Sequence, residues 1–296
     1  MAELRPDHAL APLGAGHPGC TRRGALRGLA TLGAATTGAA LLTSGASASA
    51  EAFPRTAKPG GGPESWAPAP VEDIVFDGPR GTLLAAWAPA SPSLGGVLLL
   101  HENRGLDAHY RSLAGRFAAS GYSALALDMV SEEGGTASLP DPAAVAAALS
   151  AAPPERFDAD MAAGLDELRR RLPREDVGAV GFGFGGGMVW RLLAAGADLT
   201  AAAPVYGPFP YQADLSGTSA AVLGIYGGLD DRVNATREAA ALALQNARLQ
   251  HTILTFEHAG HAFFNDTGAR YDPAAAAEAW RRVVAWLDEH GRGRRR

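Results

Sequence analysis

Three separate stretches of this sequence each place one acidic or imidazole side chain just after an apolar run. His261 follows Gly260 shortly after one apolar run, Asp230 follows a Gly-Gly pair after another, and Glu102 comes directly after a third. An acid that orients an imidazole, and an imidazole that takes a proton from a nucleophile or from water, form the proton-transfer part of a hydrolytic site. These residue types, in this order, therefore point to hydrolysis.

The stretch that would carry the nucleophile is rich in glycine. An apolar run from Val177 breaks into VGFGFGGG and resumes as MVWRLL, which is the outline of a strand, a sharp turn and a helix. One chemistry that uses this outline is the nucleophile elbow, G-x-Nuc-x-G, with a Ser or Cys at the apex. In that interpretation the apex residue is Gly183, which has no nucleophilic side chain.

A dinucleotide-binding loop is the alternative interpretation, because Gly181-x-Gly183-x-x-Gly186 also satisfies G-x-G-x-x-G. That loop needs an acid about 20 residues further on, at the end of the next strand, to bind the ribose. Asp198 has roughly that spacing but precedes the next expected strand, at 201–206. We therefore expect no nicotinamide, flavin or other cofactor.

The elements that must position these residues alternate along the chain. Apolar runs predict strands at 73–76, 82–87, 96–100, 123–127, 177–180, 201–206, 222–226 and 252–256. Helical spacing predicts helices from about 106 to 120, 157–172, from 186, 237–247 and 274–290. Strands separated by helices indicate an α/β fold, with a mostly parallel central sheet and helices on both faces.

The candidate residues follow the strands of this expected sheet. In such sheets, sites gather at the carboxyl ends of strands. The elbow, then the acid, then the histidine is also the chain order of an α/β-hydrolase triad. Asp230 suits the acid role better than its neighbour Asp231, which we expect to be a solvated loop carboxylate. A loop at Glu132–Gly135 is expected at the rim of the site.

The chain resembles the dienelactone hydrolase family, and more narrowly its exported bacterial members, from about Asp73 to His290. The resemblance depends on several motifs taken together: His101-Glu102-Asn103-Arg104-Gly105-Leu106, the elbow, Gly228-Leu229-Asp230 with Arg232-Val233-Asn234, Gly260-His261, and Asn265-Asp266-Thr267 with Arg270-Tyr271-Asp272.

The resemblance implies a hydrolase of lactones and esters with a Cys–His–Asp triad, in which a glutamate at the position of Glu102 helps control ionisation of the cysteine. His261 and Asp230 match the family's functional positions, whereas Gly183 replaces the cysteine. We therefore expect slow, water-mediated hydrolysis of a small ester or lactone. The alternative is an inactive relative that binds a small carboxylate or lactone.

Further groups are expected around the carbonyl of the bound ester or lactone. The backbone N–H groups of Phe184 and Asn103 are candidates for an oxyanion hole, and one such donor contributes about 3 kcal/mol of transition-state stabilisation. Arg104 and Arg270 are candidates for binding a substrate carboxylate. No metal site is expected, because the consecutive His101 and Glu102 would point to opposite faces. His101 is expected to be buried with its ring hydrogen-bonded.

The two ends of the chain read as separate from this domain at 71–291. Residues 1–50 resemble a twin-arginine export signal, with Arg22-Arg23 before a weakly apolar segment and A-x-A cleavage sites at its end. Residues 51–70 read as a Pro/Gly-rich linker and 292–296 as a basic tail. We expect export to the periplasm or beyond, with no stable membrane span after cleavage.

Net charge bears on which partners the protein can bind, and cysteine content bears on which nucleophiles it can use. The formal net charge is −5 at pH 7, which disfavours nucleic acid. The single cysteine, Cys20, lies in the predicted signal, so the remaining chain contains neither a disulfide nor a thiol nucleophile. The expected partner is a small ester, lactone or carboxylate. The composition does not predict an oligomeric state.

Overall fold

A computed structural model describes residues 67–291. The predicted signal at 1–50, the basic tail at 292–296 and most of the predicted linker lie outside the described residues. Packing begins slightly before the expected domain start at residue 71, because the Ala69 N–H donates to the Gly115 carbonyl at 3.0 Å. Within 67–291, no helix combines the length and apolar character needed to cross a membrane.

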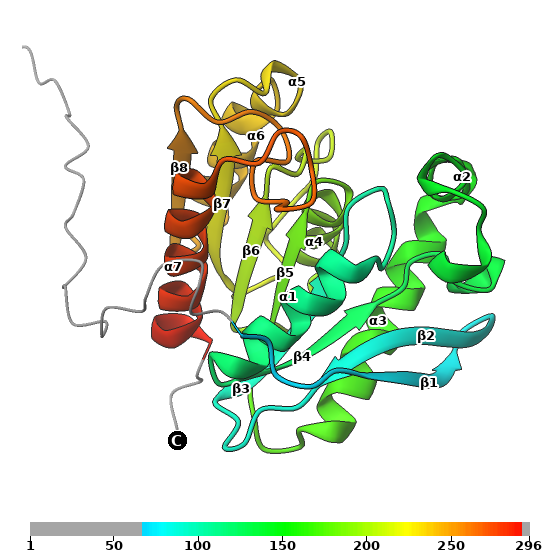
Figure 1. Ribbon diagram of the computed structural model, residues 1–296. Coiled ribbons are helices and arrows are strands. Elements are labelled where there is room, and N and C mark those ends of the chain that lie inside the picture. Colours follow the sequence, from blue (N-terminus) through cyan, green and yellow to red (C-terminus); the bar gives the residue numbers. More distant parts are fainter. Residues whose placement is uncertain (1–66, 292–296) are drawn as a thin grey trace, which may run out of the picture. The chain divides into compact units, whose positions relative to one another are not determined.

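The described chain is built on one sheet of eight strands in the order β1-β2-β4-β3-β5-β6-β7-β8 (Figure 1). The strands span β1 Glu72–Gly78, β2 Gly81–Ala88, β3 Gly95–Leu100, β4 Tyr122–Leu127, β5 Val177–Phe182, β6 Ala201–Val205, β7 Ala221–Gly227 and β8 His251–Phe256. β1 pairs with β2, and β2 with β4, in antiparallel fashion, and the other pairs are parallel. The predicted α/β class with a mostly parallel sheet is confirmed.

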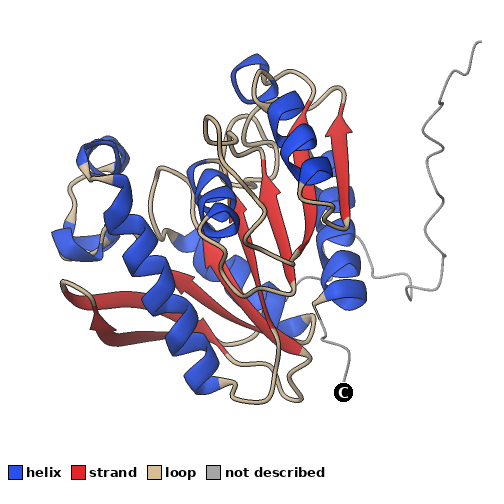
Figure 2. Cartoon of the chain, turned by 180° about the vertical axis from the view of Figure 1, so that it is seen from behind, coloured by secondary structure: helices blue, strands red, loops and turns tan. Residues whose placement is uncertain are grey.

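Helices cover both faces of this sheet, as the front and rear views show (Figures 1 and 2). They are α1 Ala108–Ala119, α2 Pro142–Ala151, α3 Pro154–Arg171, α4 Phe184–Ala194, α5 Asp231–Asn234, α6 Arg237–Asn246 and α7 Pro273–His290. One buried cluster joins the sheet to α1 and α7, and a second joins it to α3, α4 and α6. Along β3, Val97 and Leu99 belong to the first cluster and Leu98 and Leu100 to the second. This alternation is the reason the strand is apolar throughout.

The helix α2 was not predicted from the sequence. It buries only Val145 and Leu149, so its remaining alanines give no amphipathic pattern. Its start is nevertheless set by local chemistry: the Asp141 side chain accepts a hydrogen bond from the Ala144 N–H at 2.8 Å, and a proline occupies the first turn. The expected strands and the longer helices all form.

A partly buried ionic contact, with His109 buried and Asp266 29% exposed, fastens the loop after β8 to α1. Asp266 accepts hydrogen bonds from His109 Nδ1 and Arg116 Nη2, both at 2.7 Å. Burial alone would raise the pKa of Asp266, but the hydrogen bonds from Arg116 and His109 outweigh it and lower that pKa. The same loop carries residues of the candidate site, so this contact helps to position them.

We expect Asp266→Asn to lower the free energy of unfolding by about 1 kcal/mol at neutral pH, since two charge-assisted hydrogen bonds weaken and partial exposure of Asp266 reduces their contribution. A lowered native pKa means that the stabilisation is present above the unfolded-state value and is lost as the pH falls through the native value. Urea unfolding at neutral pH and at about pH 3 should therefore show the difference between the two proteins shrinking in acid.

Asp73→Asn is the matched control, because Asp73 also pairs with an arginine of α1, Arg111, but its side chain is 76% exposed. It should cost little at either pH. An equal cost for the two substitutions would contradict the assignment of stability to the partly buried contact at Asp266.

Candidate active site

Gly183 lies at the apex of a sharp turn between β5 and α4. Its backbone has φ 53° and ψ −111°, in the region that side-chain-bearing residues adopt only with strain. A hydrogen bond to the neighbouring strand β6 fixes the turn, because the Gly183 N–H donates to the Val205 carbonyl at 3.0 Å. The following helix packs unusually close: a Cβ on Gly185 would lie 2.2 Å from the Leu100 carbonyl oxygen. The glycine-rich sequence is thus required by both the turn and the close approach of helix to strand.

Asp230 and His261 meet at the carboxyl ends of β7 and β8. The His261 Nδ1 lies 2.5 Å from Asp230 Oδ2, and Asp230 is buried whereas the His261 side chain is 24% exposed. Asp230 is also the N-cap of α5, where it accepts from the Val233 N–H at 3.3 Å. The exposed Asp231 does not bond the imidazole. A carboxylate on Nδ1 directs the other ring nitrogen, Nε2, toward the pocket as a proton acceptor.

The imidazole faces the apex of the turn. A Cβ placed on Gly183 would lie 3.6 Å from His261 Nε2, 3.3 Å from Glu102 Cγ and 3.8 Å from the Tyr206 ring. The direction in which a residue-183 side chain would point is therefore the direction of His261 and Glu102. The structure brings together the four residues that the sequence placed at the reacting centre.

Glu102 is buried and oriented by an amide. Its Oε2 accepts from Asn265 Nδ2 at 3.1 Å. The Asn265 oxygen is already occupied, because it accepts from Thr267 N and Thr267 Oγ1 at 3.0 and 2.7 Å. Asn265 must therefore present its N–H to Glu102. The second oxygen, Oε1, is buried and makes no hydrogen bond of ordinary length among residues 67–291, although the nearby Tyr206 hydroxyl interacts with the Glu102 carboxylate.

Tyr206 is a residue of this centre that the sequence analysis did not single out. It is fully buried, directly follows β6, and has φ 36°, a strained value for a tyrosine. Its ring packs edge-on against the His261 ring at 5.3 Å. Burial, then the charge of the adjacent Glu102, raise the pKa of Tyr206 well above its ordinary value, so its phenol stays protonated. Its position at a strand end was the signal that could have revealed it.

The loop after β3 supplies Asn103 and Arg104. It begins at His101, which is buried as predicted: Nδ1 donates to the Glu102 carbonyl at 2.7 Å and Nε2 accepts from the Met129 N–H at 3.0 Å. Burial, opposed by the charge of Asp128, lowers the pKa of His101, so the ring is neutral and can accept at Nε2. The N–H groups of Asn103 and Phe184 donate to no other residue in the described chain. Both remain free to bind an oxyanion.

A pocket of about 1030 Å³ opens over these groups. Its lining includes Glu102, Asn103, Gly183, Phe184, Asp230 and His261, together with three arginines, Arg104, Arg232 and Arg270. None of these arginines has an ion-pair partner among residues 67–291. No group of three or more potential metal-ligating side chains is found within the same residues.

One sequence expectation about the rim is wrong. Glu132 and Glu133 lie outside the pocket and pair instead with Arg80 and Arg156. The sequence contains no local sign of this pairing, because Arg156 belongs to α3 and Arg80 to the turn between β1 and β2.

Comparison with known proteins shows which family the chain belongs to. The pattern of the dienelactone hydrolase family matches residues 83–291, which is most of the chain. The chain belongs to the dienelactone hydrolase family. A protein of Escherichia coli O157:H7 named "Putative carboxymethylenebutenolidase" is 30% identical over 211 residues, which cover 66% of this chain and 77% of that protein.

Solved structures agree with this membership of the dienelactone hydrolase family. The crystal structure titled "Putative Dienelactone Hydrolase" from Klebsiella pneumoniae superposes with a TM-score of 0.65 at 26% identity, covering 75% of this chain and 99% of that one. An acylaminoacyl peptidase from Pyrococcus horikoshii superposes at TM-score 0.61 and 14% identity, over 77% of this chain and 43% of its own, and shares the fold alone. The predicted α/β-hydrolase fold is confirmed.

Proposed function

We propose that this protein hydrolyses a small ester or lactone with a water molecule in place of a side-chain nucleophile. The observation that carries the proposal is the position of His261. Its ring is held by Asp230 at 2.5 Å, and its Nε2 would lie 3.6 Å from a Cβ on Gly183, the position where the resemblance to the family places a cysteine. A water beside Gly183 is therefore within reach of a base.

The proposed reaction uses groups of this chain alone. His261 Nε2 takes a proton from the water as its oxygen attacks the carbonyl carbon, with Glu102 Oε1 available to hold or assist that water. The N–H groups of Phe184 and Asn103 bind the resulting oxyanion. The carbon–oxygen bond to the leaving group then breaks, and the imidazolium returns its proton to the departing alkoxide.

A carboxylate on the substrate fits the arginines of the pocket. Arg104 and Arg270 line it and have no ion-pair partner in the described chain, and a guanidinium binds a carboxylate through two parallel hydrogen bonds. We therefore propose esters or lactones that carry a free carboxylate as the substrate class. Export to the periplasm or beyond remains part of the proposal and is supported by the sequence of residues 21–50.

We expect Arg270→Gln to raise KM for a carboxylate-bearing aryl ester by about 10–100-fold, since a hydrogen bond to a charged group contributes about 1.5–3 kcal/mol. The kcat, and the kinetics on the matched neutral ester, should change little. Steady-state kinetics on the two esters measure this difference. Arg174→Gln, a substitution of an exposed arginine outside the pocket, is the control and should change neither substrate's kinetics.

A second function has one specific observation in its favour. No hydroxyl or thiol side chain is among the residues that line the pocket. The protein would then be a non-catalytic receptor that binds a small carboxylate or lactone through the same arginines. Its ligands would stabilise the fold without being consumed.

One experiment separates the two functions. The purified protein without residues 1–50 is incubated with a series of carboxylate-bearing aryl esters and lactones, and product release and thermal stabilisation are recorded together. Product formation above the buffer rate, abolished by boiling the protein, supports hydrolysis. Thermal stabilisation with no product over many hours supports the receptor and overturns the proposed hydrolysis.

A further inference from the structure

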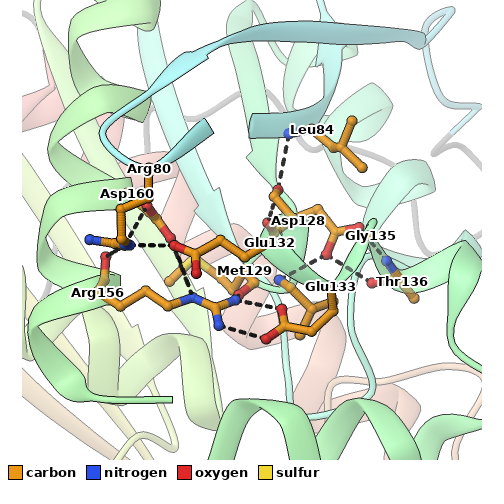
Figure 3. A network of polar contacts seen from close by, with 12 residues as sticks. Arg80, Leu84, Asp128, Met129, Glu132, Glu133, Gly135, Thr136, Arg156 and Asp160 are labelled. Carbon is orange, nitrogen blue, oxygen red and sulfur yellow. Dashed lines mark hydrogen bonds and ion pairs between the residues drawn. The ribbon is translucent and has the colours of Figure 1, made fainter. Parts of the chain in front are cut away.

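The connection between β4 and α2 runs beside the loop that carries Glu102 and Asn103, although none of its residues lines the pocket. Figure 3 shows that residues of this connection, which spans 128–141, make polar contacts with one another, with α3 and with the turn between β1 and β2. The sequence placed part of it, Glu132–Gly135, at the rim of the site, but Glu132 and Glu133 lie outside the pocket, and the proposed function gives the connection no role. Its contacts separate into an outer set, which holds the connection, and an inner set, which holds the site.

The outer set fastens the connection to α3 and to the turn between β1 and β2. Both terminal nitrogens of the buried Arg156 donate to the Glu133 carboxylate at 2.6 Å, and Nη2 also donates to the Met129 carbonyl at 3.2 Å (Figure 3). Arg80 donates to Asp160 at 3.0 Å and also pairs with Glu132. The hydrogen bonds from Arg156 lower the pKa of Glu133, which is therefore ionised at neutral pH. These contacts hold the connection in place against α3 and against the turn between β1 and β2.

The inner set depends on Asp128 and Thr136. The buried Asp128 carboxylate accepts from the Thr136 N–H at 2.7 Å and from the Thr136 hydroxyl at 2.9 Å (Figure 3). Because the hydroxyl proton is used by the carboxylate, the lone pairs of Oγ1 are left to accept. They accept from the N–H of Leu106 at 2.8 Å, and Leu106 lies near the end of the loop that carries Glu102 and Asn103.

The other end of that loop is held by the same connection. His101 Nε2 accepts from the Met129 N–H at 3.0 Å, so residues 101 and 106 are both bonded to the segment from 129 to 136. Between these two points lie the Glu102 carboxylate and the Asn103 N–H. A loop anchored at both ends keeps its intervening groups in one geometry, and a misplacement of about 1 Å can cost about 100-fold in rate.

We propose that Thr136 and Asp128 are positioning residues of the hydrolytic site, which act by holding Leu106 and thereby the Glu102–Asn103 loop. We call the hydrogen bond from the Leu106 N–H to Thr136 Oγ1 the latch. The catalytic consequence rests on the proposed function, whereas the latch itself does not. Neither residue touches the substrate pocket. Their effect is on the transition state, because an oxyanion donor acts on charge that develops only there.

The test compares Thr136→Val, which removes the hydroxyl at similar shape, with Thr136→Ser, which restores it. Ser138→Ala is the matched control: the Ser138 hydroxyl donates to the carbonyls of Glu133 and Gly135 in the same connection and does not contact the loop. Amide hydrogen exchange at Leu106 and steady-state kinetics on the carboxylate-bearing aryl ester are measured for each protein. Circular dichroism and thermal unfolding confirm that each variant is folded.

We expect Thr136→Val to speed exchange at Leu106 by at least about tenfold and to lower kcat by about 10–100-fold with KM nearly unchanged. Thr136→Ser should restore both, and Ser138→Ala should leave both near the parent values. Unchanged exchange at Leu106 in folded Thr136→Val would overturn the latch. Faster exchange with unchanged kcat would overturn the positioning role.

The latch and the proposed function can fail separately. If the parent protein turns over no ester, the proposed hydrolysis fails, and hydrogen exchange at Leu106 still decides whether Thr136 holds the loop. If the parent is active and Thr136→Val matches it in both measurements, the latch fails and the hydrolysis stands.

Discussion

Gly183→Cys is expected to raise the rate of aryl-ester hydrolysis by about 10²–10⁴-fold, because it adds a nucleophile to a site whose base is already oriented. The Cβ of the new residue would lie 3.6 Å from His261 Nε2, so the thiol is within reach of the imidazole. A burst of alcohol product equal to the enzyme concentration, followed by slower turnover, would show the acyl-enzyme that only the variant can form.

The same substitution is expected to destabilise the protein. At φ 53° and ψ −111°, a side chain costs about 1–3 kcal/mol, and the new Cβ would lie only 3.3 Å from Glu102 Cγ. Urea unfolding of Gly183→Cys and the parent measures this cost. A more active but less stable protein is the expected combination.

Gly183→Ala separates the two effects. It imposes the same backbone strain without a nucleophile, so it should lose similar stability and gain no activity. Its methyl group would also occupy the space beside His261 Nε2, so the water-mediated rate of the parent should fall. A folded Gly183→Cys protein that is no faster than Gly183→Ala would contradict the arrangement of the reacting groups inferred here.

His261→Ala is expected to lower kcat/KM for ester hydrolysis by about 10²–10⁴-fold, the usual contribution of a general base. Binding and the oxyanion donors at Phe184 and Asn103 would account for the remaining rate. Because the imidazole acts on the water and not on the ground-state substrate, KM should change little. The measurement is steady-state hydrolysis of the carboxylate-bearing aryl ester.

His258→Ala is the matched control for this substitution. His258 belongs to the same loop after β8 but is exposed and does not line the pocket, so its removal should leave the rate unchanged. Full activity in His261→Ala would rule out the proposed mechanism. In that outcome, Glu102→Gln would test whether the carboxylate is the base instead.

Much of the fold could be read from local patterns in the chain. The buried strands appear as short apolar runs, as in 96–100, because both of their faces are covered. The longer helices show apolar spacing for the opposite reason, since only one of their faces is covered. The antiparallel pairing of β2 with β4 has no such signature, and neither has the alanine-rich α2, which buries only Val145 and Leu149.

The candidate site also contains some residues that the sequence could reveal and others that it could not. Asp230, His261, Glu102 and Gly183 could be selected from the sequence because each follows an apolar run, and the carboxyl ends of parallel strands meet at one edge of the sheet. The supports of these residues could not be selected. Asn265 binds Glu102 across 163 residues, and Thr136 binds Leu106 across 30. Such pairs depend on how distant segments pack, which periodicity does not encode.

The sequence by itself determined the class of fold, the residue types available for proton transfer, and the absence of a nucleophilic side chain at position 183. Only the tertiary structure decided that Tyr206 joins the centre, that Asn265 orients Glu102, and that Glu132 and Glu133 belong to a network outside the pocket. The physical reason is that secondary structure follows from neighbours along the chain, whereas a site is assembled from side chains that meet only after the sheet has formed.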